Sequence, residues 1–130
     1  MTTEAVASSI KENDLGTTFG GGMLAMAAVV ATLAAIEEDG MLENARAVEA
    51  YLRESLAEVS NVAGVRGVGL LLGVEFTEAI AAKVNKALLE RRIITGSSSD
   101  PKVLRLLPPL CVTKEEAVLF VEALKSCIET

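Results

Sequence analysis

Apolar residues recur at helical spacing in the first half of the chain. The stretch Met23–Glu38 consists almost entirely of helix-forming residue types, with Ala, Leu and Met dominating. A second helix is predicted at Leu42–Val59, because its apolar residues repeat every three or four positions while charged residues occupy the other side. We expect that charged side to be solvated. Gly40, between the two stretches, suits the C-terminal cap of the first helix. The sequence therefore predicts a long helix pair.

The pattern changes to a β type after residue 61. Several short stretches from there on are rich in β-branched residues and leucine, and glycine or proline bounds most of them. Two strands are predicted to join at Gly67, and Cys111–Val112 is predicted as a last short strand. The other predicted strands are Val62–Arg66, Gly69–Phe76, Ile93–Thr95 and Val103–Leu107.

Two more helices are expected among these strands. One is predicted from Thr77 to Arg91, and a closing helix is predicted to reach Ile128. Thr113 and Glu116 have the spacing of a capping box, which marks the start of that last helix. The order of elements predicts an α+β fold, a two-layer sandwich. In it, a small, mostly antiparallel sheet carries helices on one face and follows the helix pair.

The amino-acid composition excludes several classes of function. Hydrophobic residues make up 51% of the 130 residues, which predicts a packed core. A formal net charge of −6 argues against a nucleic-acid partner. The chain has no histidine and two cysteines, which excludes Ser-His-Asp and Cys-His hydrolases, His-ligated zinc and a disulfide framework. We therefore expect no metal site.

Membrane and export signals are also weak. The first residues lack the basic region of a signal peptide. The uncharged aliphatic run Met23–Ile36 is shorter than the roughly 20 residues that a bilayer core requires. We therefore expect a buried helix there, no membrane partner and a cytoplasmic location.

A glycine-rich segment, Gly16–Gly22, is the first candidate for chemistry. Its glycines expose backbone N–H groups, Thr17 and Thr18 supply hydroxyls, and the following helix start favours an anion. These features suit a phosphate monoester or a carboxylate. The alternative is a turn in which glycine only allows the chain to reverse. The glycines of Gly64–Gly73 do not form a dinucleotide fingerprint, because they enter a strand instead of following one.

Arg105 is the second candidate. It lies in a hydrophobic predicted strand, where an unpaired buried charge would be costly. Its guanidinium therefore either emerges on the exposed face of the sheet or binds a carboxylate in a bidentate manner. The sequence leaves both readings open.

Several segments together resemble the C-terminal part of class-III, pyridoxal-phosphate-dependent aminotransferases, and most closely the acetylornithine/succinylornithine branch. The matching pieces occur in the order and spacing of that family and cover nearly all of the chain. They are Asp14–Gly22, Ile36–Asn44, Val65–Val74, Arg92–Gly96, Asp100–Leu110 and Thr113–Glu116.

The resemblance implies roles for individual residues. Thr18 would bind the phosphate of pyridoxal phosphate, Thr17 would lie beside the substrate, and Arg105 would hold the substrate α-carboxylate. In such enzymes the glycine-rich loop reaches across a homodimer to the cofactor of the other subunit. The implied reaction transfers an amino group between an ornithine-like amino acid and a 2-oxo acid, as in arginine biosynthesis.

The resemblance also implies what this chain lacks. The lysine that binds the cofactor would lie before Met1, and none of the lysines present matches it. No catalytic residue is therefore assigned, and pyridoxal phosphate binding by the chain alone would be weak or absent. Residues 1–22 are interpreted as an N-terminal segment with the anion loop, and 23–130 as the aminotransferase small domain. Its partner would be the missing large domain or a second copy. The alternative is a non-catalytic binding or dimerisation module derived from that domain.

Overall fold

The computed structural model describes residues 2–12, 14–18 and 20–128. The chain divides into two compact units, Met1–Ala35 and Ile36–Thr130, which we call the N-terminal and C-terminal units. The functional division at residues 22 and 23 that the sequence suggested stays a prediction.

The N-terminal unit contains the short helix α1 (Glu4–Ala7) and most of α2 (Met23–Glu38). The helix predicted at residues 23–38 is therefore confirmed, but no residue of α2 is buried. The expectation of a buried helix is wrong for this chain. No helix of the described residues has the length and apolar character needed to cross a bilayer.

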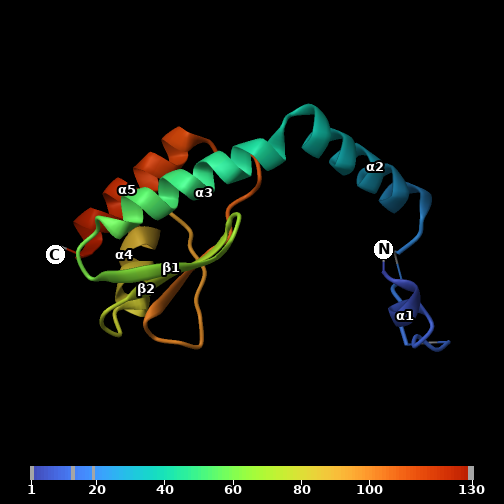
Figure 1. Ribbon diagram of the computed structural model, residues 1–130, viewed down its shortest axis with the longest axis horizontal. Helices are drawn as coiled ribbons and strands as arrows, with labels where there is room; N and C mark the ends of the chain where they lie inside the picture. Colours follow the sequence, from blue (N-terminus) through green and yellow to red (C-terminus); the bar gives the residue numbers. More distant parts are fainter. Residues whose placement is uncertain (1, 13, 19, 129–130) are drawn as a thin grey trace. The chain divides into compact units, whose positions relative to one another are not determined.

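The C-terminal unit is an α+β sandwich, as predicted. A three-stranded sheet runs in the order β1-β2-β3 with both pairs antiparallel, and helices cover one of its faces (Figure 1). Helix α3 packs against β1 and α5, while α4 packs against α5 and β3. The elements are α3 (Met41–Ala57), β1 (Val62–Val68), β2 (Leu71–Phe76), α4 (Ala81–Glu90), β3 (Val103–Leu106) and α5 (Lys114–Ile128).

The core lies between the inner face of the sheet and these three helices. Alternate residues of β2 point inward and are buried, as the period of two in a strand requires. Each helix contributes a fully buried leucine to the same cluster. The largest fully buried side chains are Phe76, Leu56, Leu72, Leu88, Leu104 and Leu124.

The hairpin between β1 and β2 turns two residues later than predicted. Val68 pairs with Leu71, so Gly69 and Leu70 form a two-residue loop. Gly69 has a φ of 59°, which suits the first position of such a loop. Gly67, the predicted joint, lies inside β1, where a Cβ would collide with the carbonyl oxygen of Leu71. Glycine is therefore needed at position 67 for close approach of the two strands.

Two predicted short strands are absent from the described residues. Residues 93–95 form no strand, and the pairing with β3 is a single bridge between Gly96 and Arg105. Cys111–Val112 belongs to a turn region, because the side-chain nitrogen of Asn44 donates to the carbonyls of Leu110 and Val112 at 2.8 and 2.9 Å. A side chain thus takes the bonds that a neighbouring strand would have made.

Some helix ends lie where the sequence predicted them and others do not. The capping box is confirmed: the Glu116 N–H donates to Thr113 Oγ1 at 3.2 Å, and the Thr113 N–H donates to Glu116 Oε2 at 2.8 Å. Helix α4 begins at Ala81 instead of Thr77. The Thr77 N–H donates to the carbonyl of Asn61 at 2.9 Å and so extends the strand region. Gly40 has a φ of 60° and follows the end of α2, as a glycine cap does.

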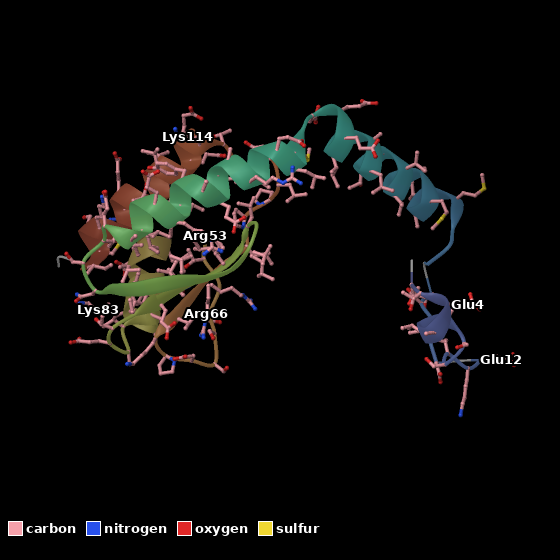
Figure 2. The ribbon with its side chains drawn as sticks, viewed as in Figure 1. Glu4, Glu12, Arg53, Arg66, Lys83 and Lys114 are labelled. Atoms are coloured by element: carbon pink, nitrogen blue, oxygen red, sulfur yellow. The ribbon has the colours of Figure 1, made fainter. Side chains whose placement is uncertain are left out.

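The charged side of α3 is less solvated than the sequence indicated. Arg53 donates to the carbonyls of Val65 and Gly67 at 2.8 and 2.7 Å and is ion-paired with Glu49 at 2.9 Å. Glu49 in turn accepts the N–H of Gly69 at 2.9 Å. Figure 2 shows Arg53 between α3 and the hairpin. This pair therefore fastens the helix to the hairpin.

Candidate functional site

Two arginines, with a glycine between them, form a row across the outer face of the sheet. In the register of the strands, Gly73 of β2 lies opposite Arg66 of β1 on one side and Arg105 of β3 on the other. An open groove of about 790 Å³ runs along this face, and the serines at 97–99 line it together with the two arginines. We call it the outer groove. It presents two guanidinium groups and three hydroxyls to solvent.

Arg105 is exposed on this outer face. Its neighbours Leu104 and Leu106 are buried, so strand alternation directs Arg105 away from the core. Within the described part of the chain, its guanidinium has no hydrogen bond and no ion pair. An unpaired guanidinium offers a planar fork of donors that matches a carboxylate. Of the two readings left open by the sequence, exposure is confirmed, and the exposed group remains available for a ligand.

Arg105 also borders an apolar cavity. This cavity has a volume of about 510 Å³, and the residues around it include Ile93, Leu107, Pro108 and Phe120. Arg105 lines both this cavity and the outer groove. A ligand with a carboxylate next to an aliphatic chain would thus find a cation and an apolar surface within one region.

Arg66 is a site residue that the sequence reasoning did not identify. Its Nη2 lies 3.6 Å from Asp100 Oδ2, and the two side chains are 58% and 43% exposed. Figure 2 shows Arg66 on the side of the sheet away from α3. A loose pair at such exposure contributes little to stability. The placement of Arg66 two strands from Arg105 could not be found without the strand register.

The glycine-rich turn lies in the N-terminal unit and holds Thr17 and Thr18. Both threonines are exposed. A Cβ at Gly20 would force the methyl group of the exposed Thr17 to move, and Gly21 has a φ of 79°, so the backbone of the turn favours glycine at position 21. Phe19, which the sequence placed in this loop, lies outside the described residues. The carbonyl of Gly22 accepts the Met26 N–H at 2.9 Å, which starts α2 directly after the turn.

These observations fit the donor chemistry expected of the two threonines. Their hydroxyls and the free N–H groups at the start of α2 are donors of the kind that bind a phosphate. Among the described residues, no group of three His, Cys, Asp or Glu side chains could hold a metal ion. Arg105 belongs to the C-terminal unit.

The chain is similar to known proteins over nearly its whole length. The profile described as "Aminotransferase class-III" matches residues 1–128. The acetylornithine aminotransferase of Bacillus subtilis is 44% identical over 116 residues, which is 87% of this chain and 30% of that protein. The acetylornithine aminotransferase of Oceanobacillus iheyensis is 37% identical over 124 residues, or 92% of this chain and 31% of that protein. The chain thus spans under a third of the length of these relatives.

Solved structures of aminotransferases are also similar to this chain. The acetylornithine aminotransferase of Elizabethkingia anophelis matches with a TM-score of 0.79 and 27% identity, covering 95% of this chain and 34% of that one. The ornithine aminotransferase of Plasmodium yoelii matches with a TM-score of 0.77 and 32% identity, again covering 95% and 34%. The arrangement of the sheet and helices described above therefore recurs in these enzymes.

Proposed function

The chain belongs to the class-III aminotransferase family, and from that premise we propose that it is the C-terminal small domain of a pyridoxal-phosphate-dependent, acetylornithine-type aminotransferase. The whole enzyme would transfer an amino group between an ornithine-like donor and a 2-oxo acid. The observation that carries this proposal is the exposed guanidinium of Arg105, which has no partner among the described residues and lies between a polar groove and an apolar cavity.

Arg105 is assigned to the α-carboxylate of the substrate. A guanidinium can donate two parallel N–H bonds to one carboxylate, which fixes the orientation of the ligand as well as its position. Because β3 is held between β2 and the core, the base of the side chain is anchored. The bound carboxylate would thereby be oriented relative to the rest of the enzyme.

Thr18 is assigned to the phosphate of pyridoxal phosphate, and Thr17 to a position beside the substrate. The exposed hydroxyls and the glycine turn support a phosphate ligand. When bound, pyridoxal phosphate supplies the electron sink for bond cleavage at the substrate α-carbon. In the proposed homodimer this turn would serve the cofactor of the other subunit.

The chain by itself is proposed to be inactive as a transaminase. None of its lysines matches the cofactor-binding lysine of the family, and without that residue the covalent step has no nucleophile. The test is titration of the purified chain with pyridoxal phosphate, followed by borohydride reduction and peptide mapping. Weak labelling spread over several lysines, without a spectral response to amino acids, is expected. Stoichiometric labelling of one lysine would contradict the proposal.

One observation favours a second candidate, a non-catalytic dimerisation module. Met23, Met26, Val30 and Leu33 follow each other at spacings of three and four along α2, and each is about half exposed or more. Sedimentation equilibrium separates the two candidates. A module forms a defined dimer that Val30→Lys dissociates, whereas a small domain taken from its enzyme forms no dimer of fixed stoichiometry.

A further inference from the structure

Gly96 lies directly beside Arg105 at the outer edge of β3. The Gly96 N–H donates to the carbonyl of Arg105 at 2.7 Å, and the Arg105 N–H donates to the carbonyl of Gly96 at 3.1 Å. These two bonds form the isolated bridge between the segment after α4 and the strand. The backbone of Gly96 is thus fixed at the level of Arg105.

The side chain of Arg105 uses the space that glycine leaves open. A Cβ at position 96 would lie 2.9 Å from Arg105 Nε and 3.3 Å from Arg105 Cβ. The first distance is shorter than a carbon and a nitrogen tolerate without a shift of one of them. Gly96 is not among the glycines with positive φ, so its backbone conformation is open to any L residue. Space beside Arg105, and not backbone freedom, is therefore the reason for glycine here.

A side chain from α4 holds this segment in place. Asn85 Nδ2 donates to Thr95 Oγ1 at 2.8 Å and to the Thr95 carbonyl at 3.2 Å. Asn85 and Thr95 are both partly buried, so these bonds are shielded in part from water. The position of Gly96 is thereby tied to a helix of the core instead of to a free loop.

We propose that Gly96 is a positioning residue for Arg105, and that Asn85 acts on the same guanidinium through Thr95. Gly96 provides a flat surface along which the arginine side chain extends, so that its donor edge faces the ligand. A side chain at position 96 would push Nε out of this arrangement and weaken carboxylate binding without touching the carboxylate. The inference rests on the proposed function, because it takes Arg105 as the carboxylate contact.

The test uses the full chain, labelled with nitrogen-15, and sodium propionate as the carboxylate probe at constant ionic strength. The Arg105 Nε–H resonance is assigned by its absence in Arg105→Gln and followed during the titration. In Gly96→Ala the apparent Kd is expected to rise about fivefold, because loss of one exposed charged bond corresponds to about 1 kcal/mol. The resonance of the ligand-free variant should also be displaced.

Gly64→Ala is the matched control, since glycine 64 lies in the same sheet and a Cβ there meets nothing within 4 Å. It should bind propionate as the unchanged chain does. Asn85→Ala adds no atom beside Arg105 and should weaken binding in the same direction as Gly96→Ala. All variants are compared well below their melting temperatures, so that loss of fold is separated from loss of binding.

The outcomes separate the two claims. If the Arg105 Nε–H resonance of the unchanged chain shows no saturable shift with propionate, Arg105 is not a carboxylate contact, and both the proposed function of this residue and the positioning role fail. If that resonance shifts on binding with the same apparent Kd in the unchanged chain, Gly96→Ala and Asn85→Ala, only the positioning role is overturned.

Discussion

Leu104 and Arg105 are adjacent in β3 and lie in opposite environments. Leu104 is 1% exposed and packs in the core cluster, whereas Arg105 is exposed on the outer face without a partner among the described residues. Strand geometry alone separates them, because successive side chains point to opposite faces. One short strand therefore contributes to stability through one face and presents an exposed guanidinium group on the other.

The surroundings of the two residues differ as much as their exposure. On the inner face, large apolar side chains such as Leu72 and Val74 fill the space. On the outer face, Arg105 has a glycine on each side, Gly73 in β2 and Gly96 at the bridge. Dense packing fixes the inner residues, while missing side chains leave room for an arginine and a ligand on the outer face.

The largest loss of stability is expected for a substitution on the inner face of the sheet. Leu104→Ala removes a fully buried side chain and should lower the free energy of unfolding by about 2–5 kcal/mol, since it loses buried surface and leaves a cavity. Urea denaturation measures this change. Arg105→Gln is the comparison variant and should stay within about 0.5 kcal/mol of the unchanged chain. Equal losses in the two variants would contradict the division between the faces.

A second prediction concerns the pair that joins α3 to the hairpin. Arg53→Met removes two bonds to strand carbonyls and the ion pair with Glu49, and should cost about 1–2 kcal/mol. Arg46→Met is the matched control, because Arg46 and its partner Glu43 are both 75% exposed. The control should change stability by less than about 0.5 kcal/mol. Chemical denaturation of both variants shows whether the contacts of Arg53 with the hairpin, or only its charge, contribute to the free energy of unfolding.

The capping box supports α5, which covers the inner face. Thr113→Ala removes the oxygen that accepts the Glu116 N–H and should cost about 1 kcal/mol. Thr113→Ser keeps that oxygen and should retain most of the stability. Thermal denaturation followed by circular dichroism compares the variants, and an equal loss in Thr113→Ser would assign the effect to the lost methyl group instead of the cap.

The smallest effect is expected on the outer face. Asp100→Asn removes the loose 3.6 Å pair with Arg66 and should alter the free energy of unfolding by less than about 0.5 kcal/mol. Denaturation at low and high salt measures it, with the difference between variants shrinking as salt rises. A loss as large as that of Arg53→Met would mean that the outer face also contributes to stability.

Features encoded within a few neighbouring residues were predictable from the sequence. The helix at 23–38 and the capping box of Thr113 and Glu116 follow from propensity and spacing. For Arg105, strand alternation gave exposure as one of two readings, and the structure selects it. The hairpin joint was placed at the wrong glycine, because Gly67 and Gly69 look alike until the strand register assigns one to close approach and the other to the turn.

Contacts between distant residues were not predictable. Arg66 reaches the outer groove through a register that no single-sequence pattern specifies, and Asn85 meets Thr95 only after α4 has packed. The bonds from Asn44 to the 110–112 turn likewise join residues that are far apart in the chain. Such side-chain bonds depend on tertiary packing, which local propensity does not encode.

The most direct test of the account is chemical modification of arginine by phenylglyoxal with and without N-acetyl-L-ornithine, followed by peptide mapping. Arg105 carries the proposed carboxylate contact, while Arg46 is an exposed surface arginine and serves as the internal reference. The account predicts that the ligand slows modification of Arg105 and leaves the rate at Arg46 unchanged. Equal rates at Arg105 with and without the ligand would contradict it.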